Sequence, residues 1–173
     1  MTALRFRFLD GARGEAGATA AAILADCLSR QGYAAKACGR SVQIQAELRR
    51  ETEPDEIYLV LHEELLADPG LLSQLDRKSA VVVCSARPAR VVRHELGRFT
   101  AGVTTVDADG IAMDEGADPV VAMLGGAARA LPIIDPDALC ASVWNYFDRD
   151  LPYAAHAAIR AFDLGYMQAQ QAI

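Results

Sequence analysis

The chain has 173 residues, of which 52% are hydrophobic and 23% charged, with a formal net charge of −6 and a pI of about 5.0. These values indicate one globular domain spanning residues 1–173, and they exclude a disordered chain. The negative charge argues against nucleic acid or an anionic membrane as the main partner. We find no membrane span and no secretion signal in the sequence, so we expect a cytoplasmic protein.

The first element is an apolar run that ends at Asp10-Gly11, and we predict it to be a strand. A loop with Gly11, Gly14 and Gly17 follows, and an Ala-rich helix is predicted over residues 18–31. Strand, glycine loop and helix in this order open a nucleotide-fold βαβ unit. Backbone N–H groups at such a helix start suit a phosphate or the backbone of another subunit.

The later elements alternate between strands and helices. A short strand (33–38), a turn at Gly39-Arg40 and an alternating, half-buried strand (41–48) predict an antiparallel pair. A charged surface connection (49–56) leads to two continuous apolar runs, 57–61 and 80–84, which with 102–106 are typical of parallel strands. Helical pieces are predicted over 63–66, 70–75, 107–113, 119–130, 135–147 and from Pro152 onward.

This order predicts an α/β, Rossmann-like three-layer domain with a mostly parallel sheet and a helical C-terminal part. Ligands of such sheets gather at the carboxyl ends of the strands, here the loops after Leu9, Leu61, Cys84 and Val106.

The four cysteines lie far apart and include no C-x-x-C pair (Cys27, Cys38, Cys84, Cys140). We therefore expect buried free thiols and no iron–sulfur cluster or zinc held by this chain alone.

Other polar residues are weak candidates for chemistry. Asp107 and Asp109 could hold a metal, but we favour a helix cap at Asp107 and a solvated Asp109. His62 follows a buried strand without a second metal ligand at a suitable spacing. We predict no catalytic residue and no metal ligand. Gly125-Gly126 predicts a tightly packed helix, and the aromatic residues near the C-terminus predict either an interface or closure of the core.

Five blocks of the chain together resemble the gamma subunit, or gamma domain, of 2-oxoacid:acceptor oxidoreductases, the family of pyruvate:ferredoxin oxidoreductase. The blocks are Phe8 to Ala25, DEIYLVLHEELLADPGLLSQLDRKSAVVVCS, VTTVDADGIAMDEG, MLGGA and AIRAFDLGY. The resemblance implies an accessory subunit that does not catalyse alone. It implies a complex with thiamine-binding and iron–sulfur subunits that uses thiamine diphosphate, iron–sulfur clusters and coenzyme A.

The polar positions depart from the family pattern. The family loop G-x-G-G-Q-G is replaced by GARGEA, and the glycine-rich loop after the second strand shrinks to CGRS at residues 38–41. The resemblance and these changes imply a kept fold with an altered ligand site. If any residues contact a cofactor, we expect Gly11, Arg13, Gly14, Gly39 and Arg40. The competing interpretation of the loop is a structural or intersubunit turn with a solvated charge pair.

Two other functions remain open on the sequence. A stand-alone oxidoreductase with an NAD-type cofactor would need an acidic residue about 20 residues past the loop, where Lys36, Cys38 and Arg40 stand instead. A non-catalytic interaction module would keep the framework and bind no ligand at all.

Overall fold

The computed structural model describes residues 2–11, 15–46, 53–97, 102–149 and 151–172. The strands are β1 (Thr2–Leu9), β2 (Lys36–Cys38), β3 (Ser41–Ala46), β4 (Glu56–Val60), β5 (Ser79–Cys84), β6 (Gly102–Val106) and β7 (Gln170–Ala172). The helices are α1 (Glu15–Arg30), the 3-10 helix η1 (Glu63–Ala67), α2 (Pro69–Leu72), α3 (Ala89–Leu96), α4 (Ala108–Glu115), α5 (Pro119–Ala130), α6 (Pro136–Phe147) and α7 (Pro152–Gln168).

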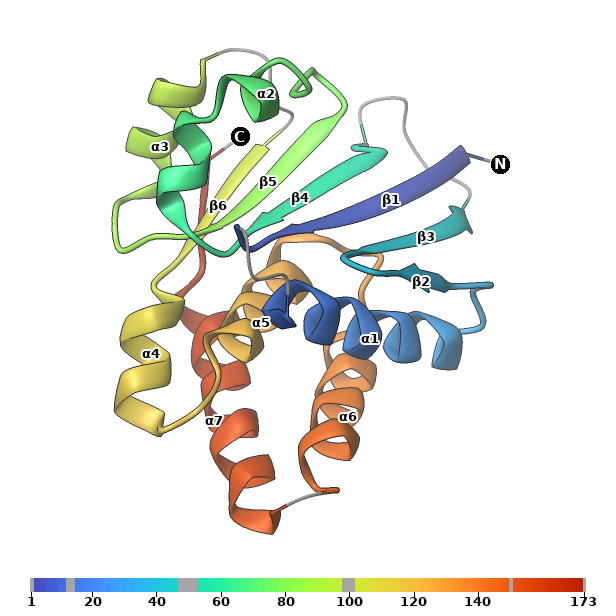
Figure 1. Cartoon of the computed structure of the whole chain (residues 1–173). Coiled ribbons are helices and arrows are strands. Elements are labelled where there is room, and N and C mark those ends of the chain that lie inside the picture. The colour runs from blue at the N-terminus through green and yellow to red at the C-terminus, as the bar shows by residue number, and fades with distance from the viewer. Residues whose placement is uncertain (1, 12–14, 47–52, 98–101, 150, 173) are drawn as a thin grey trace.

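One sheet joins all the described strands in the order β2-β3-β1-β4-β5-β6-β7. The four central strands β1, β4, β5 and β6 are parallel, and each edge carries antiparallel partners. Figure 1 shows α1, α5, α6 and α7 below this sheet and α2 and α3 above it. Parallel strands with helices on both faces confirm the predicted Rossmann-like, three-layer fold.

The alternation of β1 directs its side chains to the two faces of the sheet. Leu4, Phe6 and Phe8 are buried in the larger core, which α1 and α5 cover. Arg5 and Arg7 point to the opposite face, as the period of two requires. Burial of a Phe or Leu contributes roughly 1.5–3 kcal/mol, so this face anchors the strand against α1.

A smaller core lies above β4, β5 and β6 (Figure 1). The strands contribute four side chains to it, from Tyr58, Val60, Val81 and Val83. The helices η1, α2 and α3 cover its other side. The strands β4 and β5 are therefore buried on both faces, which explains their continuous apolar sequences.

The C-terminal helices form their layer through very close backbone contacts. A Cβ atom added to Gly125 of α5 would lie 2.2 Å from the Phe162 oxygen of α7, and one added to Gly165 would lie 2.1 Å from the Ala122 oxygen. A Cβ added to Gly126 would meet Val106 of β6 at 2.2 Å. The predicted tight packing of the Gly125-Gly126 helix is thus confirmed.

Several predicted boundaries were wrong. The first helix begins at Glu15 rather than residue 18, so Gly17 belongs to α1 and not to the loop. The strand predicted over 33–38 is reduced to β2, and β7 was not predicted because QQA lacks an apolar pattern. Residues 49–52 of the predicted surface connection lie outside the described residues. None of the helices in the described residues combines the length and the hydrophobicity that a bilayer span requires.

Candidate functional site

The carboxyl end of β1 presents a buried acid, Asp10. Its side chain is only 2% exposed, although it stands at the start of the glycine loop. The backbone N–H of Gly17 donates to Asp10 Oδ2 at 2.7 Å, and Arg40 Nη1 donates to Asp10 Oδ1 at 2.8 Å. The carboxylate therefore satisfies one of the unpaired N–H groups in the first turn of α1, where negative charge is also favoured by the helix dipole.

Arg40 brings the β2–β3 turn onto this loop. Its Nη1 also donates to the carbonyl oxygen of Gly11 at 2.9 Å, and its side chain remains 47% exposed. Gly39 has a φ of +56°, which a glycine adopts without strain and which forms the turn that presents Arg40. Gly11 has a φ of +72°, which turns the chain away from β1.

Gly17 makes the approach of these groups possible. A Cβ atom at this position would lie 2.9 Å from Asp10 Oδ2 and 3.2 Å from the Arg40 side chain. The roles of Asp10 and Gly17 were missed from the sequence. The sequence did hold a sign of this contact, because Asp10 ends an apolar strand and Gly17 follows it by seven residues, in the first turn of the next helix.

The structure brings together three of the five predicted cofactor-binding residues, Gly11, Gly39 and Arg40. The other two, Arg13 and Gly14, lie outside the described residues. Asp10 is buried and pairs with Arg40, and the arginine of the predicted loop charge pair, Arg13, lies outside the described residues.

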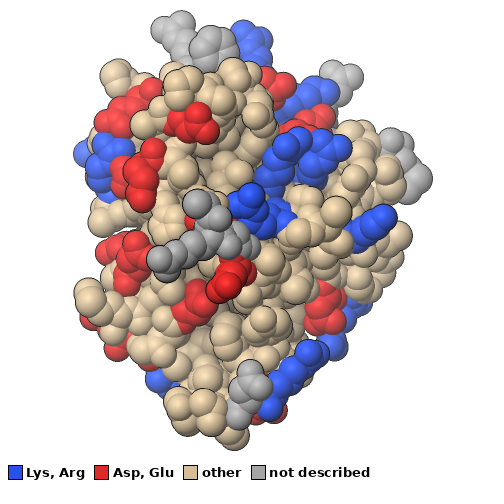
Figure 2. Space-filling view, viewed as in Figure 1, with Lys and Arg blue, Asp and Glu red and all other residues tan. Residues whose placement is uncertain are grey.

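Strand β1 carries two arginines, Arg5 and Arg7, on one face of the sheet. Figure 2 shows several basic residues at the centre and upper right of the molecule and several acidic residues at its left, with both charges elsewhere on the face. Arg5 and Arg7 both pair with Glu56, at 2.8 and 2.9 Å, and Arg7 also lies over the Tyr58 ring at 5.9 Å. Both arginine side chains are more than a third exposed and Glu56 is 28% exposed, so solvent screens the pairs and they add little to stability.

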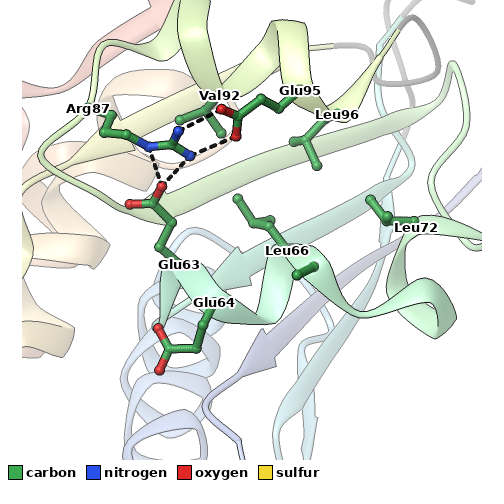
Figure 3. A pocket seen from close by; sticks show the side chains of 9 residues that line it. Glu63, Glu64, Leu66, Leu72, Arg87, Val92, Glu95 and Leu96 are labelled. Carbon is green, nitrogen blue, oxygen red and sulfur yellow. Dashed lines mark hydrogen bonds and ion pairs between the residues drawn. The ribbon is translucent and has the colours of Figure 1, made fainter.

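A groove of about 490 Å³ opens at the same carboxyl edge, between η1–α2 and α3. Arg87, which follows β5, bridges its two walls (Figure 3). Its guanidinium donates to Glu63 and makes a bidentate pair with Glu95 at 2.7 and 2.9 Å. These hydrogen bonds lower the pKa of Glu95 and raise that of Arg87. No local sequence pattern indicated this cluster, because Glu63 and Arg87 are 24 residues apart.

The thiols are only partly as expected. Cys27 and Cys84 are buried, whereas Cys38 is exposed and Cys140 intermediate, so the prediction of four buried thiols was wrong for the last two. Burial raises the pKa of Cys27 to about 12 and that of Cys84 to about 11. Both are thiols rather than nucleophilic thiolates at neutral pH.

The remaining candidates have structural or surface positions. Asp107 caps α4 by accepting the Gly110 N–H at 3.1 Å, as predicted, and Asp109 is exposed. His62 is exposed, and His156 stacks edge-on against Trp144 with ring centroids 4.9 Å apart. Within the residues that the structure describes, no group of three or more His, Cys, Asp or Glu could hold a metal ion.

The fold and this edge define a class of protein: a Rossmann-like domain whose parallel sheet carries an antiparallel hairpin beside β1. No protein-family model and no curated protein matches the sequence. Solved structures do match it, and they share the fold.

Pyruvate oxidoreductase subunit PORC of Thermotoga maritima is similar over 100% of both chains, with a TM-score of 0.77 and 22% identity. The gamma subunit of a keto/oxoacid ferredoxin oxidoreductase from Geobacter sulfurreducens is similar over 96% of this chain and 95% of its own, with a TM-score of 0.63 and 16% identity.

The 2-oxoglutarate:ferredoxin oxidoreductase of Magnetococcus marinus, solved with 2-oxoglutarate, coenzyme A and succinyl-CoA bound, has a similar region. It matches 96% of this chain and 31% of its own, with a TM-score of 0.68 and 13% identity. The structural neighbours are thus subunits or parts of 2-oxoacid oxidoreductases, the group that the sequence blocks resemble.

Proposed function

We propose that residues 1–173 act as a single, accessory gamma-type subunit of a thiamine diphosphate-dependent 2-oxoacid:acceptor oxidoreductase in the cytoplasm. The observation that carries this proposal is the end-to-end likeness to the Thermotoga maritima subunit, over 100% of both chains. The ordered sequence blocks support it independently. Thiamine diphosphate and the iron–sulfur clusters belong to partner subunits in this proposal, and the chain does not catalyse alone.

The chain's own contribution is to complete the assembly and to shape the access of coenzyme A or substrate. The proposed contact is the rim formed by Gly11, Gly39 and Arg40, with Arg13 and Gly14 of the same loop. Arg40 Nη1 is committed to Asp10 and Gly11, but nearly half of the side chain is exposed. A guanidinium so held presents its remaining donors in a fixed direction, which suits a phosphate of coenzyme A.

A second candidate function is an interaction module that has lost ligand binding. The observation that favours it is the position of the Asp10 carboxylate, which already accepts the Gly17 N–H at the start of α1. An anion at this helix start would have to approach a buried carboxylate, and the repulsion would weaken its binding. In this alternative the glycine loop is a turn that only contacts other subunits.

Co-expression with the thiamine-binding and iron–sulfur subunits of a 2-oxoacid:ferredoxin oxidoreductase from the same organism tests the main proposal. A stable complex on gel filtration is expected. A chain that elutes as a monomer, apart from all of these subunits, would overturn it.

Calorimetry of the assembled complex with coenzyme A separates the two candidates. We expect a micromolar dissociation constant that Arg40→Gln raises about tenfold, since one phosphate contact contributes on the order of 1.4 kcal/mol. Arg30→Gln is the matched control, because Arg30 also pairs with an aspartate, Asp26, and is 50% exposed. If coenzyme A does not bind, or binds wild type and Arg40→Gln equally well, the result would favour the second candidate, an interaction module whose loop does not contact this ligand.

A further inference from the structure

The groove beside Arg87 has an apolar floor that remains partly open to solvent. Leu66 and Leu72 line it from the η1–α2 wall, and Val92 and Leu96 line it from α3 (Figure 3). Leu72 is 39% exposed, whereas Val92 and Leu96 on the opposite wall are buried. A volume of about 490 Å³ accommodates a few side chains of another protein segment.

The rim of the groove carries an excess of negative charge. Among the described residues, its lining contains three acids, Glu63, Glu64 and Glu95, and one cation, Arg87. Arg87 is held by both Glu63 and Glu95, so its guanidinium is already surrounded by carboxylates. Glu64 is exposed and turned away from Arg87 (Figure 3). An acidic occupant would therefore meet Glu64 and a neutralised arginine.

An occupant that matches both features must offer an apolar surface and a positive charge. Lysine and arginine side chains do so, because their methylene stems cover apolar surface while the charged end reaches a carboxylate. One end of the groove, at Glu63 and Arg87, lies beyond the carboxyl ends of β4 and β5. Strand β1, whose carboxyl end carries Asp10, is paired with β4 in the same sheet. A segment bound there would lie along the edge where the proposed ligand contact is made.

We propose that this groove binds an apolar segment of the thiamine-binding subunit that carries a lysine or arginine, with the cation placed at Glu64. The inference rests on the proposed function and adds the position and chemistry of one subunit contact. The hollow between α6 and α7 is lined by Asp137, His156 and Arg160 and has no such charge excess, so it identifies no occupant.

The test measures the dissociation constant between this chain and the purified thiamine-binding subunit at low and at physiological salt. Glu64→Lys and Leu72→Gln alter the groove. Asp114→Lys and Met113→Gln are the matched controls, since both residues are exposed on α4, away from the groove. Circular dichroism and thermal unfolding establish that each variant is folded.

We expect Glu64→Lys and Leu72→Gln each to weaken association about tenfold at low salt, with the controls unchanged. The affinity of wild type should fall as salt rises, and this dependence should be smaller in Glu64→Lys. If wild type binds the subunit and both groove variants bind it with the same dissociation constant, the proposal that the groove is the contact is overturned, and the proposed function still stands. Wild type that does not bind the subunit would overturn both. A wild-type chain that forms dimers alone, which Leu72→Gln separates, would assign the groove to a second copy and contradict the proposal.

Discussion

Among the described glycines, Gly165 leaves the least room for a side chain, and this makes a sharp prediction about Gly165→Ala. The new methyl group would lie 2.1 Å from the Ala122 carbonyl oxygen of α5 and 2.8 Å from its carbonyl carbon. Ordinary contacts begin near 3.4 Å, and the obstacle is helix backbone that no side-chain rotation can move. The two helices must separate by about 1 Å, which weakens the packing along their whole interface.

Overpacking of this kind costs about 3 kcal/mol, while alanine in place of glycine returns about 1 kcal/mol of helix propensity. We therefore expect a net loss of about 2 kcal/mol in the free energy of unfolding, or a melting temperature lowered by about 4–8 °C for a chain of this size. Urea denaturation followed by circular dichroism measures the first quantity, and a thermal scan the second.

Gly102→Ala is the control. Among the described residues, its added Cβ would meet just the Ala172 oxygen, at 3.9 Å, so the free energy of unfolding should change by less than about 1 kcal/mol. A Gly165→Ala chain at least as stable as wild type would refute the account of the α5–α7 contact.

Three further predictions concern the loop and the thiols. Arg40→Gln should lower the free energy of unfolding by about 1–3 kcal/mol in urea denaturation, because it leaves the buried Asp10 carboxylate without its cation; an unchanged midpoint would contradict the pairing. In native protein at pH 8, a thiol reagent should modify Cys38 well before Cys27 and Cys84, as read by peptide mass spectrometry; faster labelling of either buried thiol would oppose this. The pKa values of the buried Cys27 and Cys84 thiols are raised in the fold, so the stability that their neutral forms contribute is complete below pH 9 and should be lost as pH rises toward 11–12. The urea midpoints of wild type and Cys84→Ala should therefore converge over this pH range. Midpoints that stay a constant distance apart would contradict the raised pKa of Cys84.

The strands and helices of the core were predicted well from the sequence, because burial on one or both faces produces a recognisable pattern of apolar residues. Residues 57–61 and 80–84 are continuous apolar runs, since helices cover both faces of the sheet at β4 and β5. The alternation in 41–46 marks a strand with one exposed face, and it was correctly assigned as antiparallel. The strand β7 was not predicted, because its pairing with β6 depends on backbone hydrogen bonds rather than on apolar side chains.

The site was predicted less well because its contacts join distant parts of the chain. Arg40 reaches Asp10 across 30 residues, and no local pattern shows that the two would meet. Gly11 and Gly39 have positive φ values, as glycines in the predicted turns can adopt, whereas their contact with a cofactor stays a prediction. Gly17 was assigned to the loop, but its role in α1 is to leave room for Asp10 and Arg40.

The central claim is that this chain is a working subunit of a thiamine-dependent oxidoreductase. It is tested most directly by the rate at which the thiamine-binding and iron–sulfur subunits reduce an artificial electron acceptor with a 2-oxoacid and coenzyme A, with and without this chain. The account predicts that stoichiometric addition raises this rate at least about tenfold, as expected when assembly orders an incomplete site. A rate that stays the same, with the chain remaining unbound in the mixture, would contradict it.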